Sequence, residues 1–232
     1  MHIVCCSLGK DSIAMLIKML ELKMPIDQVI FADVGEDAEF EETYAFLVKV
    51  EKTLGISITR VKSDRFTFDS YFYSPISRGP RKGMIRGFPP TCSPGCSYRR
   101  ELKIIPMEKA YGTDNDIYIG IAVDEKNRAA RKEYSTQKNR YHFPLIDLNL
   151  TEADCRRICE EHDLLHPLYQ YFRRLGCWQC PKQSLKSLYT LYTRYPEKWK
   201  KLEEYQKACN WDFQPNRNVF MLSEKFKERI EL

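Results

Sequence analysis

The stretch that decides the fold is the first twelve residues, Met1-His-Ile-Val-Cys-Cys-Ser-Leu-Gly-Lys-Asp-Ser12. Residues 3–6 are apolar or nearly so and predict a short buried strand. After Ser12, apolar side chains recur with helical spacing at Ile13, Met15, Leu16, Ile17, Met19 and Leu20. A strand, a tight glycine-containing turn and a helix direct backbone N–H groups at a bound anion. The opening of the chain therefore predicts an anion site at residues 7–12.

Each polar residue of this turn adds to the predicted site. Gly9 lets the backbone approach an anion closely. Ser7 and Ser12 supply hydroxyl donors, and Lys10 supplies a positive charge for a phosphate group. The turn lacks the first glycine and the spacing of the G-x-x-x-x-G-K-[ST] loop of P-loop NTPases. Taken alone, these residues also fit an ordinary strand–turn–helix with a polar turn.

Length and composition fit one globular domain, or one domain with an appendage. The chain has 232 residues, and no apolar run approaches the roughly 18 residues of a membrane span. Because the first strand begins at once, without a signal-peptide pattern, we expect a cytoplasmic protein. The net charge of +5 permits an anionic partner without requiring one. Basic residues gather in 78–103, in and after a glycine- and proline-rich loop that we expect to face the substrate.

Strands and helices alternate over the first two thirds of the chain. Further strands are predicted at 28–33, 56–61, 116–123 and 142–146, and helices at about 40–54 and 98–110. Short links between them predict an α/β fold, a parallel five-stranded sheet with helices on both faces, Rossmann-like. Later helices are predicted at about 151–162, 181–193, 196–209 and from 223. We therefore expect an α/β domain at 1–147 and a helical C-terminal extension at 148–232.

Polar residues follow two further strands of the predicted sheet. Asp33 and Gly35 follow the strand at 28–33, and Asp124 follows the strand at 116–123. In parallel sheets, ligands lie beyond the carboxyl ends of the strands. We therefore expect the turn at 7–12 and the acidic turn at 33–37 to share one site. Asp33 would accept hydrogen bonds from a ribose or an adenine, or help to hold Mg²⁺.

Three motifs carry a resemblance to a known family. Ser7-Leu-Gly-Lys-Asp-Ser12 resembles the S-x-G-x-D-S pyrophosphate loop (PP-loop) of the adenine nucleotide alpha-hydrolase superfamily. Asp33-Val-Gly35 followed by Phe40-Glu-Glu-Thr-Tyr44 is similar to the D-x-G…F-x-E-T-Y stretch of its phosphoadenosine phosphosulfate (PAPS) reductase-like branch, with Glu41 where the family usually has proline. The run Gly120…Asp124-Glu125…Arg128 resembles the segment in which that family contacts its nucleotide.

The resemblance implies a PP-loop (HUP-like) fold and a set of site residues. Lys10 and Asp11 would have catalytic roles, acting electrostatically and by positioning Mg²⁺. The residues implied in ATP binding are Ser7, Gly9, Lys10, Asp11, Ser12, Asp33, Gly35, Gly120, Asp124 and Arg128.

The nine cysteines include a second informative motif, which points to a metal site. Cys177-Trp-Gln-Cys180 is a C-x-x-C pair, which presents two thiolates to one metal and needs a second pair for four ligands. Cys92 and Cys96 supply that pair. Thiolate-only sites suit zinc or an iron–sulfur cluster, and the spacing does not separate the two. Redox-active or merely buried thiols are the further alternative.

Family resemblance favours the cluster over zinc. Several PP-loop relatives carry a cysteine pair, a similar gap and a C-x-x-C, and bind [4Fe-4S]. In the reductases the first pair is adjacent, whereas residues 93–95 separate Cys92 from Cys96 here. We therefore expect a [4Fe-4S] cluster on Cys92, Cys96, Cys177 and Cys180, with Zn²⁺ as the alternative.

The resemblance implies an ATP pyrophosphatase that adenylates an acceptor, for sulfur transfer at this cysteine site. A sulfonucleotide (PAPS or APS) reductase is the alternative. That chemistry needs a mobile nucleophilic thiol, and only Cys209 is a candidate, in a context that does not match the reductases. A non-catalytic nucleotide-binding subunit of a nucleic-acid modification or defence complex is the third interpretation. The acceptor stays open between a small molecule, tRNA or another nucleic acid, and a protein-bound partner, and a homodimer stays open as well.

Overall fold

The computed structural model describes residues 1–91, 95–130, 134 and 138–230. Their contacts divide the chain into two compact units. The sheet unit consists of Met1–Asp33, Glu41–Lys62 and Ile104–Tyr169, and the helical unit consists of Val34–Phe40, Ser63–Lys103 and Gln170–Leu232. The helical unit thus takes two segments from the first half of the chain. A functional boundary at residue 147 stays a prediction.

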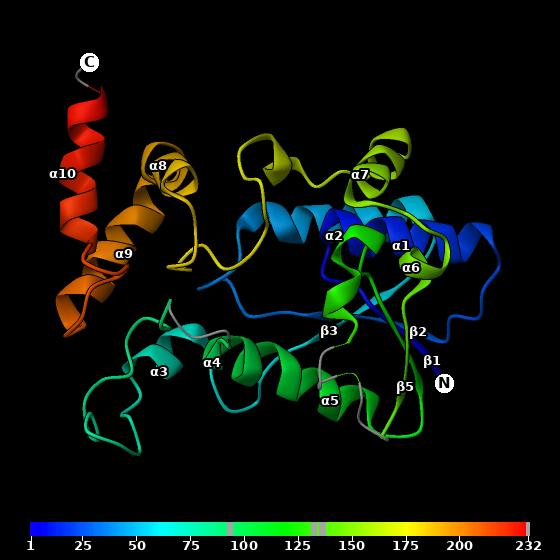
Figure 1. The fold of residues 1–232 in the computed structure, drawn as a ribbon, viewed down its shortest axis with the longest axis horizontal. Helices are drawn as coiled ribbons and strands as arrows, with labels where there is room; N and C mark the ends of the chain where they lie inside the picture. The colour runs from blue at the N-terminus through cyan, green and yellow to red at the C-terminus, as the bar shows by residue number, and fades with distance from the viewer. Residues whose placement is uncertain (92–94, 131–133, 135–137, 231–232) are drawn as a thin grey trace. The chain divides into compact units, whose positions relative to one another are not determined.

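A five-stranded parallel sheet forms the centre of the sheet unit and confirms the predicted fold class. Its order is β3-β2-β1-β4-β5. The strands are β1 (His2–Cys5), β2 (Gln28–Ala32), β3 (Ile58–Val61), β4 (Asp116–Ile119) and β5 (Arg140–His142). Figure 1 labels β1, β2, β3 and β5. Because β1 is central, the turn after it lies where the strand order reverses, the usual ligand position in such sheets.

Alternation along the strands supplies a core to each face of the sheet. Val4, Val29 and Tyr118 pack on one face with buried side chains of α1 (Lys10–Glu21), α2 (Glu41–Leu54) and α7 (Glu152–Glu161). Their neighbours Ile3, Ile30 and Ile117 point to the other face, against Met107 and Tyr111 of α5 (Ile105–Tyr111). Successive strand side chains point to opposite faces, so apolar strands are covered by helices on both sides.

The fifth strand differs from its prediction at 142–146. The structure places β5 at Arg140–His142 and forms a short helix, α6 (Pro144–Asp147), where the strand was expected. Pro144 occupies the first helical turn, where its fixed φ is favourable and its missing N–H costs nothing. The fourth strand also ends earlier, at Ile119, and a 3₁₀ helix, η2 (Val123–Arg128), follows it.

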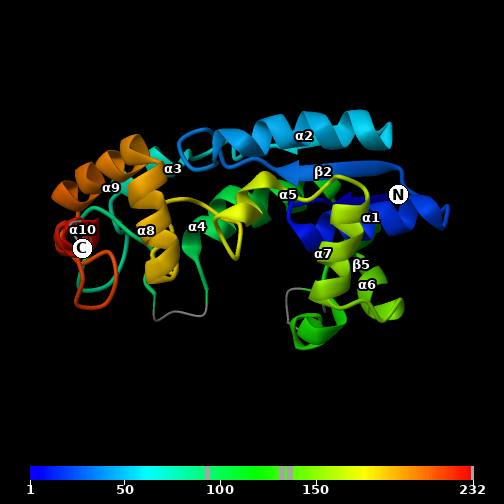
Figure 2. The same ribbon diagram turned by 90° about the horizontal axis from the view of Figure 1, so that it is seen from above.

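The helical unit is built around aromatic side chains. Tyr205 packs against Phe72 with ring centroids 4.5 Å apart, and Phe68 packs against Tyr98 at 4.7 Å. Its helices are α3 (Phe68–Tyr73), α4 (Ser97–Arg99), a π-helical turn at Arg100–Ile104 that leads into α5, α8 (Leu185–Arg194), α9 (Pro196–Ala208) and α10 (Val219–Ile230). Figure 2 shows α8, α9 and α10 side by side, in agreement with their mutual contacts. In the described ranges, no helix has the length and apolar character needed to cross a bilayer.

Candidate functional site

The turn at residues 7–12 joins β1 to α1 and is closed by the hydroxyl of Ser12. The Ser7 N–H donates to Ser12 Oγ at 3.1 Å, and the two serine hydroxyl oxygens are also 3.1 Å apart. The Ser12 hydroxyl donates to the Gly9 carbonyl at 2.9 Å. Leu8 takes a left-handed φ of 60° and buries its side chain in the core. The serines therefore fix the shape of the turn that the sequence predicted.

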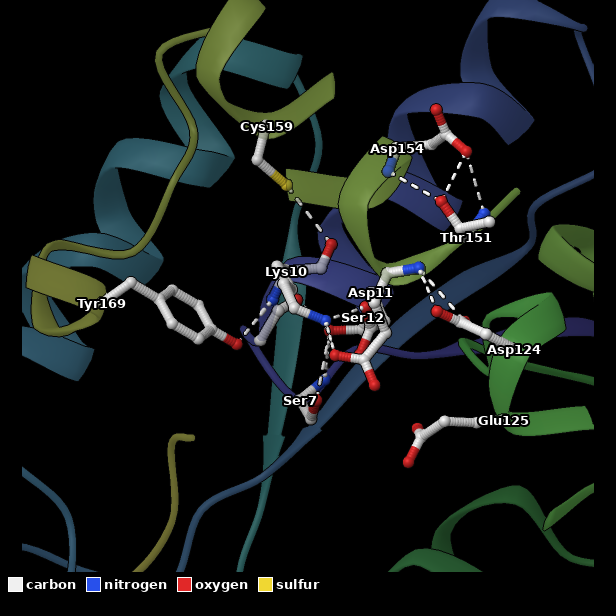
Figure 3. A network of polar contacts seen from close by, with 12 residues as sticks. Ser7, Lys10, Asp11, Ser12, Asp124, Glu125, Thr151, Asp154, Cys159 and Tyr169 are labelled. Atoms are coloured by element: carbon white, nitrogen blue, oxygen red, sulfur yellow. Dashed lines mark hydrogen bonds and ion pairs between the residues drawn. The ribbon is translucent and has the colours of Figure 1, made fainter. Parts of the chain in front are cut away.

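Helix α1 begins without a side-chain cap, because its N-cap residue is Gly9. The first turn of a helix leaves N–H groups that need acceptors, and the helix dipole favours an anion there. The Lys10 N–H donates to the hydroxyl of Tyr169 at 3.1 Å. Figure 3 shows this hydroxyl pointing at the start of the helix. A phosphate oxygen at this position would find the same amide.

Lys10 is held between two carboxylates. Its Nζ lies 2.7 Å from Asp11 Oδ1 and 2.7 Å from Glu152 Oε2, and its side chain is only 12% exposed. Burial opposes the charged ammonium, but the hydrogen bonds to Asp11 and Glu152 outweigh burial and raise the pKa of Lys10. For Asp11, burial is the main cause of a raised pKa, against the lowering effect of Lys10. The charges of Glu152 and Glu125 raise this pKa further. With two carboxylates facing one amine, Lys10 is a fixed positive charge beside the turn.

Gly120 follows β4 and touches the turn directly. A Cβ at this position would lie 2.9 Å from both the N and the Cα of Ser12. Real Cβ atoms do not approach backbone that closely, so only glycine fits without moving the start of α1. The structure thus brings together Gly120 and the turn, two sites that are 108 positions apart, counted from Ser12 to Gly120.

The other implied nucleotide-binding residues have partners of their own. Asp33, at the end of β2, is buried, accepts a hydrogen bond from the Tyr44 hydroxyl at 2.8 Å and lies 3.4 Å from Lys62 Nζ. Asp124 accepts the Glu152 N–H at 3.1 and 3.2 Å and so caps α7. Arg128 pairs with Glu125. Gly35 has a φ of 92° and belongs to the helical unit. Nucleotide contacts by these residues stay predictions.

Three residues of the site had no part in the sequence prediction. Tyr169 comes from η4 (Pro167–Gln170), Glu152 begins α7, and the Cys159 thiol donates to the Lys10 carbonyl at 3.2 Å. Burial raises the pKa of Cys159 to about 12, so its thiol is neutral. In the structure, Thr151 and Asp154 form a capping box at the start of α7, but no pattern in the sequence showed that this start faces Lys10.

The cysteines expected to bind metal lie in the helical unit, except that Cys92 lies outside the described residues. Cys177 and Cys180 form a tight turn, in which the Cys180 N–H donates to the Cys177 carbonyl at 3.1 Å. Both thiols interact electrostatically with Cys96, and burial is the main cause that raises the pKa of Cys177 to about 12. An all-thiol donor set fits an iron–sulfur cluster or zinc. Among the described residues, no three His, Cys, Asp or Glu side chains converge into a metal site.

Cys209, the thiol that a reductase would need, is buried in the helical unit. Burial raises its pKa, although the N–H groups of Trp211 and Phe88 lower it in part. A Cβ on Gly87 would overlap its sulfur. These contacts hold the thiol in a packed position, whereas attack on sulfur needs an accessible thiolate.

Comparison with known proteins decides the family. The family model described as "Phosphoadenosine phosphosulfate reductase domain" matches residues 1–183. The chain belongs to this family. This confirms the resemblance that the PP-loop motifs carry, because the matched range includes the turn at 7–12, Asp33, Gly120 and the C-x-x-C pair.

Two single proteins are similar to the chain, one in sequence and one in fold. The chain is 28% identical over 218 residues to "Uncharacterized protein MJ0066" of Methanocaldococcus jannaschii, in a match that covers 89% of this chain and 42% of that protein. The chain thus corresponds to less than half of that relative. The PAPS reductase of Candida auris, solved as a phosphate complex, aligns with a TM-score of 0.51 and 17% identity over 77% of this chain and 82% of the reductase.

A second solved structure is more distant. The U34-tRNA thiolase NcsA of Methanococcus maripaludis, solved with its [4Fe-4S] cluster, aligns with a TM-score of 0.45 and 14% identity over 99% of this chain and 71% of the thiolase. The Candida auris reductase supports the shared fold, and the assignment of a reaction depends on the residues of this chain.

Proposed function

We propose that this member of the family is an ATP pyrophosphatase that adenylates an acceptor. One observation carries the proposal: the start of α1, whose N-cap Gly9 has no side chain to cap it, and the part-buried cation Lys10 lie in the turn that follows the central strand. This arrangement suits the phosphate chain of a nucleotide, because backbone amides and a fixed positive charge stabilise phosphate oxygens. The packed position of Cys209 argues against sulfur attack as the reaction.

The reaction places the β- and γ-phosphates of ATP at the turn. An oxygen of the acceptor attacks the α-phosphorus, the bond from that phosphorus to the bridging oxygen breaks, and pyrophosphate leaves with the electron pair. Negative charge builds on the departing pyrophosphate, where Lys10 and the amides of the first turn of α1 stabilise it. Asp11 would hold Mg²⁺, which supplies further neutralisation when bound. Asp33 would accept hydrogen bonds from the ribose.

The adenylated acceptor is activated for displacement of AMP by sulfur. Cys92, Cys96, Cys177 and Cys180 would hold a [4Fe-4S] cluster, with Zn²⁺ as the second candidate for these thiols. When bound, such a cluster supplies iron that can carry the sulfur. The acceptor that we favour is a nucleic acid, because basic side chains gather on the helical unit around residues 78–86.

A sulfonucleotide reductase is the second candidate, favoured by the description of the family model. One assay separates the two. Anaerobically purified protein is incubated with ATP, APS or PAPS, and pyrophosphate and sulfite are measured. Pyrophosphate from ATP supports the proposal, and sulfite supports the reductase.

Two variants assign the activity to the turn. Lys10→Ala should reduce pyrophosphate release by at least about a hundredfold, since one positioned donor or charge contributes on the order of 10²–10³ in rate. Lys18→Ala, on the exposed side of the same helix, is the matched control and should stay near the wild-type rate. Equal loss in both variants, or none in either, would contradict the proposal.

A further inference from the structure

The helical unit contains a pocket that the proposed reaction does not use. Its volume is about 500 Å³, which is within the range of small-molecule sites. Arg81, Arg86, Phe88, Trp211, Asp212 and Gln214 are among the residues that line it. All of them belong to the helical unit, so the shape of the pocket depends on this unit alone.

One wall of the pocket is formed by the glycine- and proline-rich loop, which the structure folds into a hairpin. Pro75 and Ile85 form an antiparallel bridge. The Arg86 N–H donates to the Ser74 carbonyl at 2.9 Å, and the Gly87 N–H donates to the Phe72 carbonyl at 3.0 Å. The hairpin, residues 74–87, is therefore fixed to the end of α3.

A second wall, residues 211–215, contacts the hairpin through Trp211 and Arg81 and is held by two buried glutamines. Gln206 donates to the Trp211 carbonyl at 3.0 Å and accepts the Phe213 N–H at 3.2 Å. Gln214 donates to the carbonyls of Pro181 at 2.7 Å and Gln183 at 3.0 Å. Pro181 directly follows Cys180, so the wall of the pocket is tied to the C-x-x-C turn.

Flat aromatic and cationic groups line this rigid pocket together. The Arg81 guanidinium lies 4.8 Å from the centroid of the Trp211 ring, and the Arg86 guanidinium lies 4.4 Å from that of Tyr71. Residues 74–91 contain four basic residues and no acidic one. Asp212 lines the pocket and offers a carboxylate acceptor. An aromatic ring stacks on Trp or Arg, a phosphate pairs with Arg, and an amino group donates to Asp.

We propose that this pocket binds a nucleotide, namely an unpaired nucleotide of a single-stranded nucleic acid. The base stacks on the Arg81 guanidinium, which itself lies over the Trp211 ring. Arg86, whose guanidinium donates to Ser74 Oγ and the Pro75 carbonyl, adds positive charge for the phosphate. A strand is favoured over a free nucleotide because Arg78 and Lys82, exposed on the same hairpin, extend the positive charge beyond the lining of the pocket. Additional phosphates of a strand would meet those charges.

The bound nucleotide would also be the acceptor of adenylation and sulfur, and this role rests on the proposed function. The binding of a nucleotide in the pocket does not rest on it. The hydrogen bond from Gln214 to the Pro181 carbonyl supports this role, because it connects the pocket wall to the turn of Cys177 and Cys180. Lys10→Ala separates the two ideas. This variant should lose pyrophosphate release and keep the affinity for a single strand.

The test is binding of a fluorescein-labelled oligocytidylate, whose base carries the amino group that would donate a hydrogen bond to Asp212. Its length of about 12 nucleotides is within the range of about 4–16 nucleotides for single-strand sites, and binding is followed by anisotropy at low salt. Trp211→Ala and Arg81→Gln should each weaken binding by about tenfold. Lys225→Gln is the control, because it removes the same charge from an exposed position on α10 of the same unit. It should change the affinity by less than about twofold.

Trp211→Phe guards against a folding defect, since phenylalanine keeps a ring above Gly87. This variant should retain most of the binding and lose part of the quenching of tryptophan fluorescence that the oligonucleotide causes. Equal affinities of wild type, Trp211→Ala and Arg81→Gln would overturn the pocket as the site, as would an absence of binding. If CMP bound as tightly as the oligonucleotide, the ligand would be a free nucleotide, and the proposal of a single strand would be overturned.

Discussion

The turn at 7–12 and the cysteine region of the helical unit are held by different forces. In the turn, backbone and side-chain polar groups satisfy one another, through Ser7, Ser12 and the amide of Lys10. Around the C-x-x-C turn, contacts of large aromatic rings predominate. Trp178 lies under the Lys198 ammonium at 5.8 Å, and its ring centroid is 6.3 Å from that of Tyr205. The turn is therefore sensitive to small changes of backbone and charge, and the cysteine region to changes of packing.

Two glycine substitutions, one in each region, test this difference directly. Gly120→Ala places a Cβ 2.9 Å from the backbone of Ser12. It should weaken ATP binding at least tenfold and lower the free energy of unfolding by about 2 kcal/mol, because the start of α1 must move. Calorimetric titration with ATP and urea denaturation measure the two effects.

Gly87→Ala is the counterpart in the helical unit. Its added Cβ would overlap Cys209 and lie 2.9 Å from the Trp211 ring, at a left-handed φ of 64°. The cost in stability should again be about 2 kcal/mol, but ATP affinity should stay within about twofold of wild type. If Gly87→Ala lost ATP binding while Gly120→Ala kept it, the expected difference between the two regions would be contradicted.

Acid should weaken the sheet unit through His166. Its ring is buried against Phe46, with centroids 4.6 Å apart, and burial lowers its pKa to about 4. Between the ordinary pKa of about 6.5 and this value, the unfolded chain binds a proton that the folded chain does not. The free energy of unfolding should fall by about 2–3 kcal/mol between pH 7 and pH 4.5.

His166→Phe should flatten the stability profile in this pH range, because the titrating group is gone. Urea denaturation at pH 7 and pH 4.5 measures both proteins. The same loss in the variant would show that other groups cause it, and His162, exposed beside Glu21, is the control position.

Tyr169→Phe tests whether the hydroxyl competes with phosphate at the start of α1. The variant removes the acceptor of the Lys10 N–H. It should lower the free energy of unfolding by about 1 kcal/mol and strengthen pyrophosphate binding by a few fold. Weaker pyrophosphate binding would instead make Tyr169 a partner of the phosphate.

The smallest effect is expected for Glu152→Gln, which removes one of the two carboxylates on Lys10. Glu152 is 44% exposed, and such ion pairs contribute about 0.2–1 kcal/mol. The affinity for ATP should therefore rise by no more than about fivefold. Calorimetry would contradict this account if the affinity fell.

The sheet unit was largely predictable, because its signals are local. Short continuous apolar runs mark β1 and β2, and apolar residues with helical spacing mark α1. The motif around residues 7–12 also located the turn of the site. The error at 142–146 has a physical reason: an apolar run does not separate a strand from a short helix, and Pro144 favours the helix.

The partners of Lys10 were not predictable, because they depend on the register of distant elements. Tyr169 is 159 positions away from Lys10, and Glu152 is 142 positions away. The close approach of Gly120 to Ser12 follows from the pairing of Cys5 with Ile119 across β1 and β4. The helical unit is still harder to predict from the sequence, because residues 34–40 join it only through tertiary contacts, such as the hydrogen bond from the Trp178 N–H to the Ala38 carbonyl.

The central claim is that the turn at residues 7–12 binds the phosphates of a nucleotide. Titration of the protein with ATP and Mg²⁺ in a calorimeter, compared with Lys10→Ala and Lys18→Ala, tests it most directly. We predict saturable binding by wild type and Lys18→Ala, and binding weakened at least tenfold in Lys10→Ala. Equal affinity in all three proteins, or no binding by wild type, would contradict the account.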